Sequence, residues 1–81
     1  MMEKNEILEK VIETTIDKIG FDDEDINKDS NFINDLGCDS LDCIELLMEF
    51  EIMFNISIPD EDADNVKTVS EAVDLIHELM D

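Results

Sequence analysis

Apolar residues recur at helical spacing in three stretches of the chain, and no stretch alternates apolar and polar positions as a strand does. In the first stretch, one helical face is expected to end near Gly20 and to consist of Ile7, Leu8, Val11, Ile12, Thr15, Ile16 and Ile19. The second stretch runs from about Ser40 to Asn55, and Asp39 is its expected N-cap.

The last stretch opens with a predicted capping box, in which Thr68 and Glu71 accept hydrogen bonds from each other's backbone N–H groups. Its buried face is expected to consist of Val69, Ala72, Val73, Ile76 and Leu79. Before it, Pro59 precedes the segment DEDADN, which is long enough for only a short helical turn. The pattern therefore predicts an all-α fold, a small four-helix bundle with three longer helices and one short helix.

The connection between the first two helices, residues 21–37, has no sustained periodicity and is rich in Asp, Asn and Ser. A loop of this length needs apolar anchors to lie against the core. The expected anchors are Phe21, Ile26, Phe32, Ile33 and Leu36. We expect residues 1–81 to form a single domain with this one long first loop.

The predicted second helix has apolar residues on two faces. One face is expected to supply the core with Cys43, Leu46, Leu47, Phe50, Met53 and Phe54. The opposite face combines carboxylates with apolar side chains, namely Asp42, Glu45 and Glu49 beside Leu41, Met48 and Ile52. Such a face suits the docking of a partner protein, because the acids orient a basic patch and the apolar residues supply buried area. The alternative is a helix that is buried on both sides and whose acids are merely solvated.

Acidic residues dominate the charge, since 24 Asp and Glu face 5 lysines and give a formal net charge of −19. This charge repels nucleic acids and anionic membranes and favours encounters with basic protein patches. The hydrophobic fraction of 43% is still high enough for a folded chain. No apolar run has the length of a membrane span, and the N-terminal segment has the pattern of neither a signal peptide nor a transit peptide. We expect a cytoplasmic location, or an organelle if a transit peptide has been removed.

Ser40 raises the question of chemistry, because it lies between two carboxylates in the motif DLGCDSLDC. A catalytic serine needs a base and an oxyanion hole, but the single histidine, His77, is remote in sequence and the carboxylates oppose an oxyanion. The simplest role for Ser40 is to cap the helix, although Asp39 already suits that position. A phosphate ester on Ser40 would instead lie on the open N–H groups of a helix N-terminus.

The stretch DLGCDSLDCIELLMEFE resembles the modification motif of the acyl carrier protein family, in which D-S-L follows a Leu-Gly pair. The likeness spans nearly the whole chain. Four further segments fall in register, namely Ile19-Gly20-Phe21, Asn31-Phe32, Ile58-Pro59-Asp60 and Thr68-Val69.

The resemblance implies that Ser40 carries a 4'-phosphopantetheine arm, derived from coenzyme A and added by a separate phosphopantetheinyl transferase. An acyl chain would ride as a thioester on the terminal thiol of this arm, so the protein would be a carrier and not an enzyme. In the family the acyl chain can withdraw between the helices, into a pocket that here would be lined by Phe32, Leu46, Leu47, Phe50, Ala63, Val66, Ala72 and Ile76. The same residues also suit an ordinary core.

The resemblance also implies partners, namely the transferase, basic-surfaced enzymes of fatty-acid synthesis and acyltransferases, all docking on a monomer. Helical geometry places one of the matching acids, Glu51, towards the flank of its helix. The acids that match the family's partner contacts are Asp39, Asp42, Glu45, Glu51 and Asp60. Together with the apolar stripe of Leu41, Met48 and Ile52, they form the expected docking surface.

Three positions depart from the family's pattern. Ile52 stands where bacterial fatty-acid carriers often have an acid, and Cys38 and Cys43 replace small or hydroxylated residues. We expect Cys43 to point into the core, and Cys38 to be exposed near Ser40 with its thiol kept protonated by the surrounding negative charge. Across a helix start, the two thiols are poorly placed for a disulfide.

Other functions are weighed against this one. Residues 23–34 alternate acids as an EF-hand loop does, but Lys28 stands where that loop needs glycine and Asn34 where it needs a bidentate Glu. No metal site is expected, although clustered acids leave weak, structural binding of divalent cations open. The remaining alternatives are an unmodified acidic docking protein and a discrete carrier of polyketide, D-alanyl or aminoacyl groups.

Overall fold

The computed structural model of the protein describes residues 3–20 and 26–80. They form the four helices α1 (Lys4–Ile19), α2 (Ser40–Phe54), α3 (Asp60–Asn65) and α4 (Val69–Met80). The expected fold is confirmed: three longer helices and one short helix, with no strand within these two ranges. Phe21, one of the expected loop anchors, lies outside the described residues.

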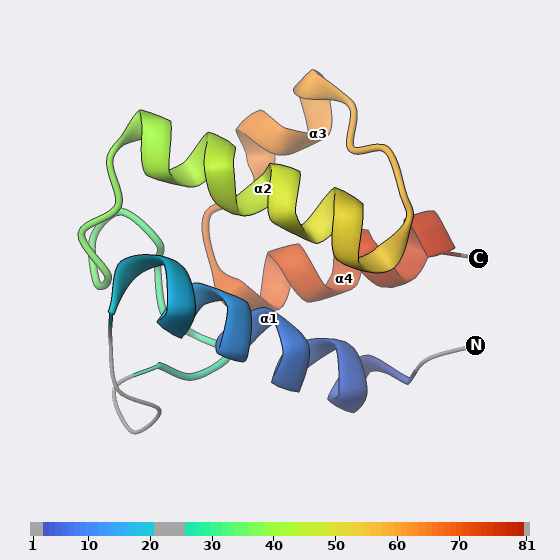
Figure 1. Ribbon diagram of the computed structural model, residues 1–81, viewed down its shortest axis with the longest axis horizontal. Coiled ribbons are helices and arrows are strands. Elements are labelled where there is room, and N and C mark those ends of the chain that lie inside the picture. The colour runs from blue at the N-terminus through green and yellow to red at the C-terminus, as the bar shows by residue number, and fades with distance from the viewer. Residues whose placement is uncertain (1–2, 21–25, 81) are drawn as a thin grey trace.

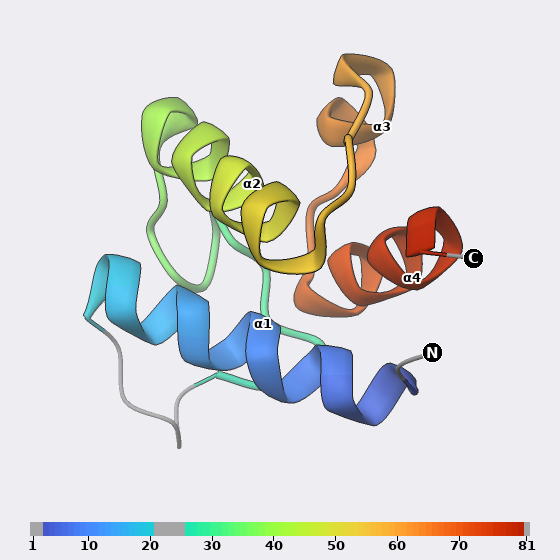
Figure 2. The same ribbon diagram turned by 45° about the vertical axis from the view of Figure 1, so that its right-hand side comes forward.

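Three of the helices enclose one core. α1 packs most extensively against α4 and also contacts α2, which itself contacts α4. Figures 1 and 2 show that α1 runs in the direction opposite to α2 and α4, and that α3 lies on the side of α2 and α4, away from α1. The N-terminus of α2 therefore lies at the opposite end of the molecule from the end of α4 (Figure 1).

The helix ends follow the local signals of the sequence. Gly20 ends α1 in the left-handed conformation, at φ 77°, and its N–H donates to the Ile16 carbonyl at 2.8 Å. At the start of α4, Thr68 Oγ1 accepts from the Glu71 N–H at 3.2 Å and Glu71 Oε1 accepts from the Thr68 N–H at 3.0 Å. This exchange confirms the predicted capping box and satisfies N–H groups that a helix start leaves without intrahelical partners.

The long first connection lies against the start of α4. Residues 28–32 are joined to residues 67–70 by three backbone hydrogen bonds of 2.8–3.0 Å. The loop is anchored as expected by buried Ile26, Phe32 and Leu36. The expectation for Ile33 is wrong, because 57% of this residue is exposed.

Candidate functional site

The N-terminus of α2 is closed by two aspartates. Asp39 is the N-cap, and its Oδ1 accepts from the Asp42 N–H at 2.8 Å, while Asp42 Oδ2 accepts from the Asp39 N–H at 3.4 Å. Ser40 is the first residue of the helix and is exposed. Since the Asp39 side chain performs the capping, the Ser40 hydroxyl is left free of that task.

The first turn of α2 keeps two N–H groups without any hydrogen-bond acceptor among the described residues. The N–H of Asp42 is taken by the Asp39 side chain, and the N–H of Cys43 donates to the Asp39 carbonyl at 3.0 Å. This leaves the N–H groups of Ser40 and Leu41, directly beside the Ser40 hydroxyl. They and the helix dipole are the donor set that suits a phosphate ester on Ser40. The two aspartates act against this attraction, but solvent at this exposed end screens them.

The turn before α2 is built around the Asn31 side chain. Asn31 Oδ1 accepts from the N–H groups of Ile33 and Asn34, both at 2.9 Å, and Asp35 Oδ2 accepts from the Asn31 N–H at 2.7 Å. These bonds fold residues 31–35 into a compact turn with Ile33 on its outer side. This is the physical reason that Ile33 does not anchor the loop.

The chain then enters α2 through Gly37 and Cys38. Gly37 has φ 72°, a conformation that side chains other than glycine rarely adopt. The Cys38 N–H donates to the Phe32 carbonyl at 2.9 Å, and only 3% of Cys38 is exposed. The expectation of an exposed Cys38 is therefore wrong, because the bond that closes the turn directs this residue inward.

No imidazole serves the Ser40 hydroxyl. His77 lies in the last turn of α4, at the end of the molecule opposite the N-terminus of α2 (Figure 1). The site thus presents an accessible hydroxyl at a helix start, without the base that a serine nucleophile needs.

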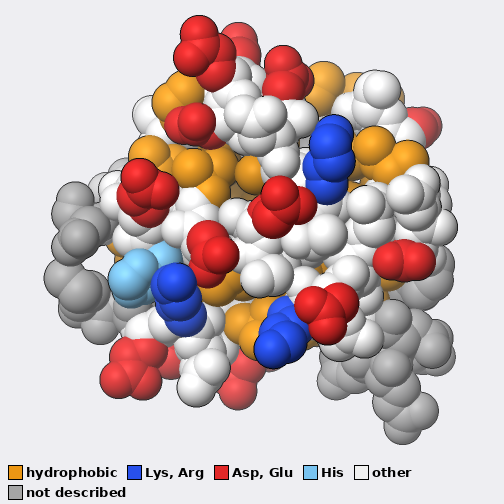
Figure 3. All heavy atoms as spheres, turned by 180° about the vertical axis from the view of Figure 1, so that it is seen from behind, with side chains coloured by type: hydrophobic (Ala, Val, Ile, Leu, Met, Phe, Trp, Pro, Cys, Tyr) orange, Lys and Arg blue, Asp and Glu red, His pale blue; other side chains and the backbone are white. Residues whose placement is uncertain are grey.

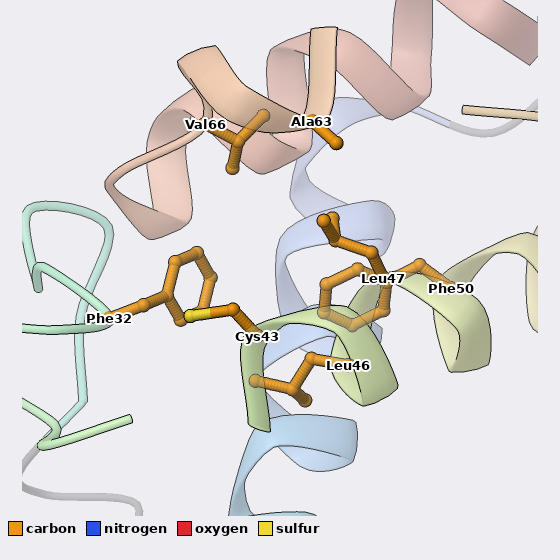
Figure 4. A pocket seen from close by; sticks show the side chains of 7 residues that line it. All are labelled: Phe32, Cys43, Leu46, Leu47, Phe50, Ala63 and Val66. Atoms are coloured by element: carbon orange, nitrogen blue, oxygen red, sulfur yellow. The ribbon is translucent and has the colours of Figure 1, made fainter. Parts of the chain in front are cut away.

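A small apolar cavity of about 30 Å³ lies between α2 and the segment that contains Ala63 and Val66 (Figure 4). Figure 4 shows side chains of α2 facing Ala63 and Val66, with Phe32 at one side. The cavity is lined by Phe32, Cys43, Leu46, Leu47, Phe50, Ala63 and Val66. Six of these residues belong to the eight expected in an acyl pocket. Ala72 and Ile76 do not line the cavity and are buried in the core, and Cys43 was not among the expected lining residues.

The opposite side of α2, which we call the outer face, is open to solvent. The structure therefore excludes a helix buried on both sides. Ile44 was missed in the sequence, although it lies at helical spacing from Met48 and Ile52. Met53 was expected in the core but is 44% exposed. The exposed apolar residues of the outer face are Leu41 (62%), Ile44 (55%), Met48 (55%) and Ile52 (77%).

The acids expected at the docking surface differ in their environment. Asp39 and Asp60, at the starts of α2 and α3, are exposed. Glu45 is half-buried, and its Oε2 lies 3.8 Å from the Nζ of Lys18 in the last turn of α1. Glu51 has an internal contact, because its Oε2 accepts from the Ile58 N–H at 2.8 Å.

Comparisons with known proteins decide the family. The family described as a phosphopantetheine attachment site matches residues 9–76. A protein of Porphyromonas gingivalis named acyl carrier protein is 46% identical over 72 residues, which are 89% of this chain and 92% of the relative. The chain belongs to the acyl carrier protein family. Acyl carrier proteins of Rubrobacter xylanophilus and Guillardia theta are 46% and 47% identical, and the matches cover 95% and 93% of this chain and the same shares of the two relatives.

Membership accounts for the missing base, because acyl carrier proteins are carrier domains and are typically non-catalytic. Their cofactor is 4'-phosphopantetheine, the group that the matching family description names. None of the described helices combines the length and the apolar character that spanning a bilayer requires. Within residues 3–20 and 26–80, no group of three or more acidic, His or Cys side chains is arranged to hold a metal ion. The first acids of the EF-hand-like segment, Asp23 and Asp25, lie outside these residues.

The two cysteines of this carrier flank the cap of α2. Cys38 precedes the N-cap and Cys43 is the fourth helical residue, the two positions whose side chains pack together in a hydrophobic staple. Burial, followed by the nearby Cys43 thiol and Asp42, raises the pKa of Cys38 to about 11. Burial also raises the pKa of Cys43. Both thiols are thus held protonated, as expected for Cys38, but the first cause is burial and not the surrounding charge.

Proposed function

We propose that this protein carries acyl groups as thioesters on a 4'-phosphopantetheine arm attached to Ser40, and delivers them to enzymes of fatty-acid synthesis. The observation that carries the proposal is the exposed Ser40 at the first position of α2, relieved of capping by Asp39. It lies within residues 9–76, which match the family's attachment-site domain. The relatives named acyl carrier protein support the same role.

The residues around Ser40 fit the group. The phosphate of the arm would lie on the N–H groups of Ser40 and Leu41, at the positive end of the α2 dipole. When bound, the arm supplies the thiol on which the thioester is formed. Asp39 and Asp42 hold the helix start rigid beneath the attachment point through their exchanged hydrogen bonds.

The acyl chain would enter the cavity between α2 and the segment that contains Ala63 and Val66. A volume of about 30 Å³ holds roughly one water molecule, so this cavity must widen to accept a chain. Ala63 belongs to α3 and Val66 directly follows it, whereas the most extensive helix packing joins α1, α2 and α4. We infer that α3 shifts away from α2, because it is the wall of the cavity with the least support.

Partners would dock on the outer face of α2. The proposed partners are the phosphopantetheinyl transferase and basic-surfaced enzymes of fatty-acid synthesis, including acyltransferases. Their basic groups would meet the acids, and their apolar groups would bury the exposed stripe. The proposed contacts are Asp39, Leu41, Asp42, Glu45, Met48, Glu51, Ile52 and Asp60, joined by Ile44. A single-domain monomer in the cytoplasm fits this role.

Attachment can be tested with coenzyme A and a broad-specificity phosphopantetheinyl transferase. The intact mass of the wild-type chain should rise by one phosphopantetheine, and Ser40→Ala should abolish this increase without loss of helical circular dichroism. Ser57→Ala, which alters another exposed serine, is the matched control and should be modified like the wild type. Modification of Ser40→Ala would place the arm elsewhere and refute the assignment. The intact mass of the protein purified from its own cells would identify the acyl group.

A further inference from the structure

Lys18 of α1 lies beside α2, a helix whose charged side chains are all acidic. The sequence of α2 contains four carboxylates and no lysine or arginine. Lys18, in the last turn of α1, places its Nζ 3.8 Å from the Glu45 carboxylate on α2. The other ion pair between described residues joins Lys4 to Asp74 at 3.0 Å, on the side where α1 packs against α4.

The surroundings of Lys18 keep its ammonium near Glu45. The last turn of a helix favours a cation, because the carbonyl ends of the helix dipole lie there. The Lys18 side chain is 33% exposed and that of Glu45 is 44% exposed, so a partner can reach this pair. Lys18 also contributes to a groove between α1 and α2, whose lining residues are Thr14, Asp17, Lys18, Glu49 and Met53.

Lysines elsewhere occupy a different setting. Figure 3 shows the face turned away from the viewer of Figure 1, where lysine side chains are interspersed with acidic ones. Lys4 and Lys28 line a depression together with residues of α4. Because Lys18 pairs with Glu45 of α2, it can affect how a basic partner binds to this acid.

A basic group that approaches Glu45 also meets the Lys18 ammonium, which lies 3.8 Å from that carboxylate. We propose that Lys18 is a specificity-determining residue of the docking surface, the internal counter-ion that a partner's cation must displace from Glu45. The inference rests on the proposed function and adds to it a residue that weakens the binding of some partners. Docking must break the Lys18–Glu45 pair and bring two positive groups together, which lowers the affinity for partners with a uniformly basic patch.

The test compares Lys18→Gln with Lys4→Gln. Each variant removes one positive charge and one ion pair of α1, so the net charge of the protein changes equally. The measured quantity is kcat/KM for arm attachment by a transferase with a basic docking surface, at low salt. Lys18→Gln should raise kcat/KM above that of Lys4→Gln, and added salt should reduce the difference. Equal values for the two variants, or a lower value for Lys18→Gln, would overturn the proposal.

A double-mutant cycle isolates the pair itself. Glu45→Gln should reduce kcat/KM both in the wild type and in the Lys18→Gln background. Exposed ion pairs contribute about 0.2–1 kcal/mol, so the fold reduction should be roughly 1.5 to 5 times larger in the Lys18→Gln background. Equal factors in the two backgrounds would show that no pair is broken on docking and would refute the inference. Failure of the proposed function gives a different result, because the wild-type chain would then not be modified at all.

Discussion

The Glu51 carboxylate should stabilise the fold and not only the docking of partners. Its Oε2 accepts the Ile58 N–H at 2.8 Å, and its own carbonyl accepts the Ile56 N–H at 3.1 Å. Glu51 thereby fixes the connection that leads from α2 to α3, in which Ile56 and Ile58 pack against the core. Glu51→Ala would leave the Ile58 N–H without its acceptor.

The size of this stabilisation follows from the fact that the Ile58 N–H donates to a charged carboxylate. A hydrogen bond to a charged group contributes about 1.5–3 kcal/mol, and the lower half applies because this bond is only partly buried. Removing one carboxylate from a chain with net charge −19 relieves some self-repulsion. We therefore expect Glu51→Ala to lower the free energy of unfolding by about 1–2 kcal/mol, which corresponds to a fall in Tm of roughly 4–16 °C.

Urea denaturation followed by helical circular dichroism at neutral pH would measure this effect. Glu49→Ala is the matched control, because it removes an exposed carboxylate of the same helix. The control should keep the wild-type midpoint or exceed it slightly, and Glu51→Gln should lie between Glu51→Ala and the wild type, since its amide oxygen is a weaker acceptor. If Glu51→Ala and Glu49→Ala unfold at the same midpoint, the hydrogen bond to Ile58 does not stabilise the fold.

Two further predictions concern Cys38 and the two faces of α2. The pKa of Cys38 is raised from 9.0 to about 11, so its contribution to stability is present below pH 9 and is lost as the pH rises to 11. The wild type should lose about 2–3 kcal/mol more than Cys38→Ala across that window, and parallel pH profiles of the unfolding midpoint would contradict this. Leu46→Ala should cost about 2–5 kcal/mol, because Leu46 is 2% exposed. Met48→Ala should cost less than about 0.5 kcal/mol of stability yet slow arm attachment, and equal losses of stability would contradict the assignment of the faces.

Signals that act within a few residues predicted most of the fold. Helical periodicity predicted that α1, α2 and α4 exist, since a buried stripe recurs wherever a helix covers a core. The caps at Asp39 and Thr68 were also predicted, because each requires only a side-chain oxygen within three residues of the N–H group it accepts from. The exposed Ser40 followed from the same argument, since Asp39 occupied the cap.

The sequence could not predict orientations that depend on the closing of the first loop. Ile33 faces outward and Cys38 inward, the reverse of the expectation, because the Asn31 side chain and the bond from Cys38 to Phe32 set the turn. The internal role of Glu51 depends on a residue seven positions away, beyond the end of the helix, and no periodic pattern records such a bond.

Helical geometry also could not predict how much of the surface of α2 the neighbouring helices cover. It gives the angle of each side chain around α2, but not the width of the surface that α1 and α4 cover. Met53 was assigned to the core by its angle, yet it lies at the edge of the α1–α2 contact and is 44% exposed. Ile44 was not assigned to the outer face, although 55% of it is exposed.

The pairing of residues 28–32 with residues 67–70 bears on when the proposed attachment site is completed during synthesis. These segments are far apart in the chain, and the second of them leads into α4, which leaves the ribosome after α1 and α2. Until this part of the chain emerges, residues 28–32 lack the backbone of residues 67–70 with which they form hydrogen bonds. In addition, α1 lacks α4, the helix against which it packs most extensively. A nascent chain that ends before residue 67 would therefore offer the transferase a serine without a defined surface around it. We expect the arm to be added only after residues 67–70 and α4 have emerged from the ribosome.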